Sequence, residues 1–263
     1  HTRLRNVTGV QTCALPISLV LSAALTATPA SAQDGGERVT YIRDTEIEDT
    51  LRADALPLFK AAGVDSKRIQ IVIVASKDLQ ATAGPGVMQV YTGLISQTKN
   101  PNELQGVMAH EIGHLAGAHS ARRGDMQSAG MKPFLLTMGL GVLAAVAGSP
   151  EAAAGLAGSA SYFGTIGALG YSREQESRAD QAGATFLETA GLSGRGLVEF
   201  FDNFRYQEVF ASARRFKFFV SHPLSSDRID ALRSRVEVLP HYNAVDPPEA
   251  VERHAVMQAK LDG

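Results

Sequence analysis

The chain has 263 residues, of which 20% are charged and 44% are apolar. That length is enough for one large domain or two small ones with a sizeable hydrophobic core. The 25 Lys and Arg residues nearly balance the 27 Asp and Glu residues, so the net charge of -2 gives no basic excess for a nucleic-acid partner. A single cysteine, Cys13, excludes both an intrachain disulfide framework and a cysteine-based zinc finger.

The first 32 residues are expected to lie outside the fold. Residues 18–32 form an apolar stretch that ends in Ala-Ser-Ala, which is typical of the cleavage site of a secretory signal peptide. Residues 7–17, VTGVQTCALPI, resemble a translated sequencing adapter, so we interpret 1–17 as an artefact and 18–32 as a signal-peptide remnant. Residues 33–263 would then form an exported, cysteine-free mature chain.

The first half of the mature chain is expected to contain a helix and two strands. Apolar spacing favours an amphipathic helix over 44–62, which Pro57 is expected to kink or divide. The β-branched run at 69–75 predicts a strand, and the Gly- and Pro-containing residues 82–86 predict a turn. The run VMQVY at 87–91 predicts a second strand, which would lie at the edge of the sheet or in a hairpin.

The rest of the chain is expected to be mostly helical. Asn102 is expected to cap a helix over 103–119, with Gln105 completing a capping box. The apolar run at 134–147 falls short of the roughly 20 residues of a membrane span, so a buried or membrane-touching helical hairpin is expected over 134–170. Further helices are expected at 172–190, at 197–210, after a cap at Ser226 and after 246–248. The predicted fold class is therefore α+β, mainly α, with a small β-sheet.

The sequence His-Glu-Ile-Gly-His at 110–114 lies in the middle of the predicted helix. Residues i and i+4 share one helix face, so the imidazoles of His110 and His114 can bind one Zn²⁺ ion. Glu111 can then act as the general base toward a water molecule at the metal. Two core histidines with ordinary hydrogen bonds would be the structural alternative.

A catalytic zinc site usually needs a third protein ligand. Position 120 is Ser, which excludes the pattern with a third His six residues after the second, and His119 lies at the wrong helical phase. The later segment YSREQESRADQAG offers Glu176, with Asp180 one turn further on the same face. Glu174 is a rival ligand on a different face of that helix, and a solvated helix face is the alternative for both glutamates.

Three motifs occur in order along the chain: HEIGH at 110–114, ESRAD at 176–180, and SHP at 221–223, which is followed by Asp227 and Arg228. In this combination the chain resembles peptidase family M forty-eight, which includes HtpX, the CAAX-prenyl endopeptidases and the BepA-type peptidases of the periplasm. The resemblance implies a zincin-like metallopeptidase domain over 33–263 with one Zn²⁺ ion per chain. It also implies that a C-terminal helical-repeat domain, carried by BepA-like relatives, could follow.

The resemblance also implies roles for particular residues. It favours Glu176 over Glu174 as the third zinc ligand, and it likens the strand at 87–91 to the family's substrate-aligning edge strand: Val87, Met88, Gln89, Val90 and Tyr91. From its pattern alone this strand fits an ordinary edge strand equally well. The chain departs from the family at Gln80-Ala81, where many relatives carry Asn-Ala, and this departure affects the expected positioning of substrate.

Asp180, His222 and Arg228 are expected to lie around the metal. Asp180 would accept a hydrogen bond from a ligating histidine and orient it. The resemblance implies that the loop with His222 reaches the site, where this side chain would stabilise the oxyanion or occupy the fourth zinc position and keep the enzyme latent. Arg228 would brace the same loop through an ion pair. A loop histidine and a surface arginine are the structural alternatives.

Together these features predict a zinc-dependent endopeptidase that hydrolyses misfolded or unassembled envelope proteins by means of a metal-activated water molecule. The expected partners are unfolded or misassembled polypeptides and no nucleic acid, with a possible peripheral contact between 134–170 and a membrane. The alternative is a latent or chaperone-like binding factor on the same scaffold. Oligomeric state, cleavage preference and physiological substrate do not follow from the sequence.

Overall fold

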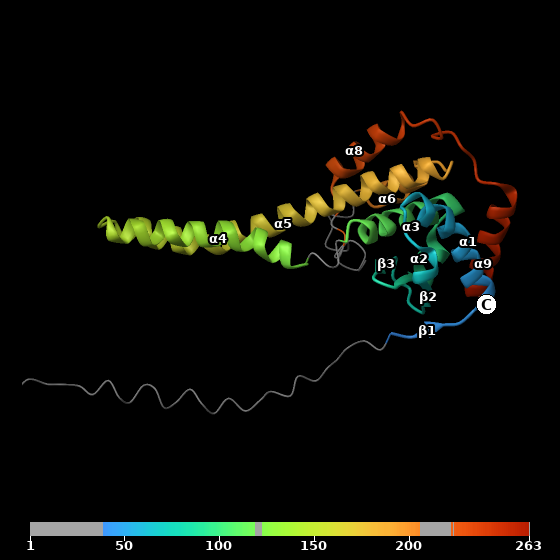
Figure 1. Ribbon diagram of the computed structural model, residues 1–263, viewed down its shortest axis with the longest axis horizontal. Helices are drawn as coiled ribbons and strands as arrows, with labels where there is room; N and C mark the ends of the chain where they lie inside the picture. Colours follow the sequence, from blue (N-terminus) through green and yellow to red (C-terminus); the bar gives the residue numbers. More distant parts are fainter. Residues whose placement is uncertain (1–38, 119–122, 206–221, 223, 263) are drawn as a thin grey trace, which may run out of the picture. The chain divides into compact units, whose positions relative to one another are not determined.

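The computed structural model describes residues 39–118, 123–205, 222 and 224–262. In this part of the chain the fold is mainly helical with a small mixed sheet, as predicted (Figure 1). The interpretations of 1–17 and 18–32, and His119, lie outside the described residues. The helices are α1 (Thr45–Ala61), η2 (Ser66–Arg68, a 3-10 turn), α2 (Thr92–Gln97), α3 (Pro101–Ala116), α4 (Arg123–Val146), α5 (Pro150–Thr189), α6 (Arg195–Asp202), α8 (Ser226–Val236) and α9 (Pro248–Asp262).

The sheet has four strands in the order β1-β2-β4-β3, where β1 is Tyr41–Ile42, β2 is Gln70–Val74, β3 is Ala81–Gly84 and β4 is Val87–Tyr91. β2 and β4 run parallel, and β4 pairs antiparallel with β3 on its other side. Of the two alternatives predicted for 87–91, the edge strand is wrong, because β4 is hydrogen-bonded along both sides. The hairpin is confirmed, because β4 pairs antiparallel with β3. Within the described residues, β3 forms the edge of the sheet next to β4.

The strand β3 was missed because three of its four residues are Ala or Gly, which are uncommon in strands. Most of the predicted turn over 82–86 belongs to this strand, and only Pro85 and Gly86 connect it to β4. Gly86 has a φ of 85°, which a glycine adopts without steric strain. The chain thus forms a tight hairpin, and no other strand of the described residues pairs with the other side of β3.

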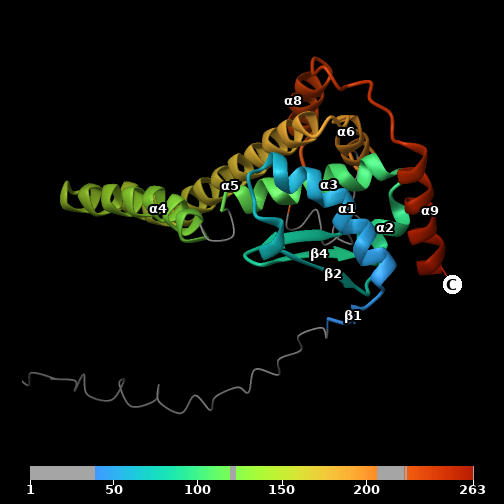
Figure 2. The ribbon, with the colours of Figure 1, turned by 45° about the vertical axis from the view of Figure 1, so that its right-hand side comes forward.

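The core lies between the sheet and the helices α1 and α3, which Figure 2 shows on the same side of the sheet. Helix α1 is capped by Asp44, whose Oδ1 accepts hydrogen bonds from the backbone N–H groups of Glu46 and Ile47 at 3.0 Å each. The helix runs through Pro57 without the predicted division. The carbonyl that loses its partner there belongs to exposed Ala53, where water can take the place of the missing N–H.

Helix α3 begins two residues before the predicted start. Its cap is Asn100, whose Oδ1 accepts from the N–H of Glu103 at 2.8 Å, and Pro101 occupies the first helical position. Asn102 lies inside the helix. Its amide donates to the carbonyl of Ser193 and accepts from the N–H of Gly196, both at 2.8 Å. The predicted cap residue therefore joins the start of α3 to the start of α6.

Helices α4 and α5 pack against each other as a hairpin closed by Gly148, in agreement with the predicted hairpin over 134–170. α5 continues without interruption into the helix that was expected to start at 172. The apolar run at 134–147 was predicted to be too short to span a membrane. That prediction is wrong for α4, because the helix begins at Arg123, before the apolar run. Within the described residues, Gly124–Val146 is long and apolar enough to cross a membrane, and 17% of its most apolar stretch is buried.

The C-terminal helices differ from their predictions mainly at the ends. α6 stops at Asp202, and 203–205 form a turn where the helix predicted over 197–210 was expected to continue. Residues 206–210 of that prediction lie outside the described residues. α8 is capped by Ser225 and not by Ser226: the Ser225 hydroxyl accepts from the backbone N–H of Arg228 at 3.4 Å. α9 follows the two prolines as expected and packs on α1 and α2.

The buried Asp54 gives the fold a pH-dependent element. Asp54 on α1 is 4% exposed, and it accepts a hydrogen bond from Gln105 on α3 at 3.3 Å. Burial raises the pKa of the Asp54 carboxyl to about 6, against the opposing hydrogen bond from Gln105. The folded-state pKa of Asp54 lies above its unfolded-state value. The contribution of the neutral carboxyl to the free energy of unfolding is therefore complete below about pH 4 and is lost as the pH rises through 6.

We expect Asp54→Asn to raise the free energy of unfolding at pH 8 by about 2 kcal/mol, because the ionised carboxylate is no longer buried. Near pH 4 the same substitution should have little effect, since Asp54 is then protonated. Urea unfolding at both pH values measures the difference. Asp49→Asn, at an exposed position of the same helix, is the matched control. An equal gain at both pH values would contradict the assignment.

Candidate metal centre

The candidate site forms where α3 crosses α5, and two glycines allow the close approach. A Cβ atom at Gly113 would lie 2.7 Å from the carbonyl oxygen of Ala179. A Cβ atom at Gly183 would lie 3.1 Å from the backbone nitrogen of His110. Any larger side chain would thus push the two helices apart. The absence of side chains at this crossing brings the histidines of α3 against the carboxylates of α5.

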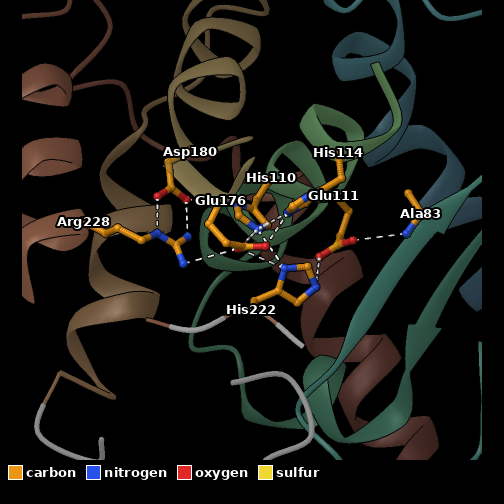
Figure 3. A network of polar contacts seen from close by, with 8 residues as sticks. All are labelled: Ala83, His110, Glu111, His114, Glu176, Asp180, His222 and Arg228. Carbon is orange, nitrogen blue, oxygen red and sulfur yellow. Dashed lines mark hydrogen bonds and ion pairs between the residues drawn. The ribbon is translucent and has the colours of Figure 1, made fainter. Parts of the chain in front are cut away.

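Four side chains converge at this crossing (Figure 3). His110 and His114 come from α3, Glu176 comes from α5, and His222 comes from the segment before α8. Each offers one ligand atom, and these atoms all lie within 4.8 Å of one another. The motif at 110–114, the first acidic residue of 176–180 and the later histidine are therefore brought together from three parts of the chain.

The spacing of these atoms fits a tetrahedral metal ion. Bonds of roughly 2.0–2.1 Å, as in zinc sites, place tetrahedral ligands about 3.3 Å from one another. His110 Nε2 lies 3.1 Å from His114 Nε2 and 3.4 Å from Glu176 Oε2. His222 Nδ1 lies 3.3 Å from His110 Nε2 and 3.1 Å from Glu176 Oε2. Glu176 Oε1 completes the set at 3.3 Å from His114 Nε2.

Asp180 and Arg228 fix the orientation of two of these side chains. Asp180 Oδ1 lies 3.0 Å from His110 Nδ1, which directs the other ring nitrogen of His110 toward the convergence point. Arg228 donates to both carboxylate oxygens of Asp180, from Nε and NH2, at 2.8 Å each. Its NH1 also lies 3.3 Å from Glu176 Oε2. The predicted contact of Arg228 is thus made with the carboxylates of α5.

The charge balance of the site favours a bound cation. The site holds three buried carboxylates, those of Glu111, Glu176 and Asp180, and the guanidinium of Arg228 pairs with only the last two. Burial alone would lower the pKa of His110, but hydrogen bonds to Asp180 and Glu176 outweigh burial and raise this pKa to about 10. The site therefore attracts positive charge, and its nitrogen and oxygen donors suit a divalent transition-metal ion.

Glu111 is held beside the convergence point and not within it. Its Oε2 accepts a hydrogen bond from the backbone N–H of Ala83 at 3.1 Å, and its Oε1 lies 3.4 Å from His222 Nε2. Glu111 is 1% exposed. The carboxylate thus bridges the edge strand β3 and the histidine cluster, which is the position required of a base acting on a molecule between them.

The structure also separates the rival candidates. Glu174 is exposed and pairs with Arg178 on the outer face of α5, away from the four converging side chains. The strand 87–91 is shielded from Glu111 by β3, and Ala83 on β3 makes the contact instead. The sequence did not identify Ala83, because it acts through its backbone N–H, which every residue except proline carries. The turn residues Pro85 and Gly86 could have indicated a hairpin that places this N–H at the edge of the sheet.

Comparison with known proteins agrees with this geometry. The model of Peptidase family M48 matches residues 42–236. Metalloprotease YcaL of Escherichia coli (strain K12) is 32% identical over 67% of this chain and 66% of its own length, and metalloprotease LoiP of the same strain is 30% identical over 66% and 65%. The beta-barrel assembly-enhancing protease of that strain is 27% identical over 57% of this chain.

The chain spans only part of these relatives: the match covers 30% of the beta-barrel assembly-enhancing protease and 40% of a relative from Vibrio cholerae that is 32% identical. The family model nevertheless covers most of the chain, including the site helix, the ESRAD segment, His222 and Arg228. The fold and the cluster of possible metal ligands agree with that match. The chain therefore belongs to peptidase family M48.

Proposed function

We propose that the chain is a zinc-dependent endopeptidase in which His110, His114 and Glu176 hold one Zn²⁺ ion and Glu111 is the general base. The observation that carries this proposal is the convergence of the ligand atoms within 4.8 Å, with Glu111 held beside them. When bound, zinc would polarise the scissile carbonyl and make water a better nucleophile at neutral pH. Asp180 and Arg228 would keep His110 and Glu176 in position.

Glu111 would accept the proton of the attacking water and return it to the leaving amide nitrogen. The hydrogen bond from the Ala83 N–H orients its carboxylate for both steps. The side of β3 away from β4, where the described part of the chain adds no strand, lies at this carboxylate, so we place the substrate as an added strand along Ala81–Gly84. This replaces the earlier placement along 87–91, whose strand has no unpaired edge.

For substrates, we propose unfolded or misassembled proteins of the Gram-negative envelope, in the periplasm. The names of the relatives support this class, since several are beta-barrel assembly-enhancing proteases. We also propose membrane contact through 134–170, which the apolar surface of that hairpin supports. Extended substrates of this kind suit recognition by strand addition, because the backbone groups of the peptide supply most of the hydrogen bonds.

Removal of the metal tests the proposal. Treatment of the full chain with a zinc chelator is expected to abolish cleavage of labelled, unfolded casein, and one equivalent of Zn²⁺ per chain should restore it. Metal content is measured beside activity by elemental analysis. Full cleavage by metal-free protein would contradict the proposal, as would a stoichiometric metal other than zinc in the active protein.

A second function, a latent or chaperone-like binding factor, is favoured by the position of His222. Its Nδ1 lies within 3.3 Å of two candidate ligand atoms, as a fourth ligand would, and its Nε2 lies 3.4 Å from Glu111 Oε1. In that arrangement His222 occupies the place of the substrate or the water molecule. The protein would hold unfolded chains in this state without cutting them until His222 is displaced.

We expect His222→Ala to raise kcat/KM by roughly tenfold, since the competing fourth ligand no longer has to be displaced. Zinc affinity should fall modestly in the same variant. His241→Ala, an exposed histidine paired with Glu188, is the matched control and should change neither quantity. A large loss of kcat would assign His222 to oxyanion stabilisation instead. Unchanged turnover and unchanged zinc affinity would contradict both roles.

A further inference from the structure

In the α4–α5 hairpin, small residues lie between the helices and most large apolar side chains lie on the outside. A helical hairpin in water has the reverse arrangement, with its large apolar side chains buried. Small residues form the closest contacts between its helices: a Cβ atom at Gly167 would meet the carbonyl oxygen of Ala129, and one at Gly130 would lie 2.8 Å from that of Gly164. The buried positions include Thr137 and Ala160. Close backbone contact through small residues holds helices together in membranes, where burying large apolar side chains brings no gain.

Most of the large apolar side chains of the hairpin are exposed. On α4 they cover about half of the helix circumference by the 3.6-residue period, which is wider than the apolar stripe of an ordinary amphipathic helix. They are between 44% and 83% exposed: Met131, Leu135, Leu136, Leu140, Val142, Leu143 and Val146. On α5 four more large apolar side chains are exposed: Tyr162, Phe163, Ile166 and Leu169. One docked protein would cover one face, whereas lipid covers all outward faces at once.

The hairpin is also nearly free of charged residues, and two of its threonine hydroxyls are hydrogen-bonded within their own helices. Between Lys132 on α4 and Arg173 on α5, the sole charged residue is Glu151, next to the turn that joins the helices. The hydroxyls of Thr137 and Thr165 donate to carbonyls four residues earlier in their own helices, at 2.8 and 2.9 Å. These hydroxyls need no water, which suits a hydrocarbon environment.

We propose that α4 and the N-terminal half of α5 insert into a lipid bilayer as a helical hairpin. The 23 residues Gly124–Val146 extend about 35 Å, which exceeds the roughly 30 Å of the hydrocarbon core. Figure 1 shows α4 alongside this half of α5, so both helices enter together. This goes beyond peripheral contact and does not depend on peptidase activity.

Insertion places the candidate metal centre close to the membrane surface. Glu176 follows Gly170 on the same continuous helix, about 9 Å further along its axis. Arg173 and Glu174 lie between them and mark where the helix leaves the apolar region. The chemical class of substrate is then narrowed to polypeptide segments within about 10–20 Å of the bilayer. This narrowing, unlike the insertion, rests on the proposed peptidase function.

The chain contains no Trp, so a single introduced Trp reports its own surroundings. We would compare Leu136→Trp and Leu143→Trp with Val238→Trp, which is exposed outside the hairpin. Each full chain is mixed with vesicles of phosphatidylethanolamine and phosphatidylglycerol that carry brominated acyl chains. The hairpin variants should show blue-shifted emission and strong quenching, and Val238→Trp should show neither. Unchanged emission of the hairpin variants would overturn the proposal.

Flotation with unbrominated vesicles separates lipid from other occupants. The double variant Leu136→Glu with Leu143→Glu should float at least tenfold less than the unmodified chain, whereas Val238→Glu should float normally. Glu111→Gln should float like the unmodified chain, so that a failed peptidase assay and a failed insertion remain distinguishable. A dimer in lipid-free buffer that shields the hairpin Trp and does not float would assign the surface to a second copy and overturn the proposal.

Discussion

Replacing Glu111 with glutamine is expected to lower kcat/KM for an unfolded protein by about 10³, the scale of a general base. Glutamine keeps the size of the side chain and an oxygen that can accept the Ala83 N–H, but it cannot take up a proton at neutral pH. Glu111 is not one of the four converging side chains, so bound zinc should stay at one ion per chain. Cleavage kinetics and elemental analysis of the same preparation measure both quantities.

Glu174→Gln is the matched control for this experiment, because Glu174 is exposed on the outer face of α5. It should retain full activity and full zinc content. The pair also tests the choice of the third ligand, since loss of zinc from Glu174→Gln would favour Glu174 over Glu176. Equal cleavage by wild type and Glu111→Gln would exclude the peptidase mechanism, and the binding-factor alternative would then remain.

A single methyl group at the helix crossing is expected to have the second largest effect. In Gly113→Ala the new Cβ meets the Ala179 carbonyl at 2.7 Å, and backbone cannot move aside as a flexible side chain could. The crossing must open, which should lower the free energy of unfolding by about 1–3 kcal/mol. The same displacement moves Glu176 away from His110 and His114. We therefore expect zinc affinity to fall at least tenfold and activity to fall up to about 10².

Gly139→Ala provides the control, because Gly139 lies inside a helix with nothing within 4 Å of its Cβ position. There the substitution should be neutral or stabilise by up to about 1 kcal/mol, as helix propensity predicts. Zinc titration and urea unfolding of both variants give the comparison. If Gly113→Ala binds zinc as tightly as wild type, the close crossing does not position the ligands.

Helical period accounts for the grouping of the candidate residues within each helix. The spacing of His110 and His114 sets two imidazoles on one helix face, and the spacing of Glu176 and Asp180 does the same for two carboxylates. Bringing the two helices together is a tertiary event, and no local pattern in 176–180 singles out Glu176 from Glu174. The family resemblance supplied that choice, and the geometry of the described residues agrees with it.

Two of the errors concern backbone groups whose partners the residue type does not reveal. The edge of the sheet was assigned to 87–91 because β-branched residues mark that strand, whereas Ala81–Gly84 forms the edge with residues of low β-propensity. Asn102 resembles a helix cap by residue type, but its amide binds backbone groups of Ser193 and Gly196. Local propensity cannot reveal such long-range partners.

The long helix α5 has a consequence for the order of assembly. His114 and Glu176 are about 60 residues apart, and the whole α4–α5 hairpin lies between them. The two halves of the metal centre can therefore meet only after the chain has run out along α4, turned at Gly148 and returned along α5. A nascent chain that carries only the HEIGH helix holds two of the four converging ligands. Assembly of the four-residue cluster is thus deferred during synthesis until the hairpin has closed.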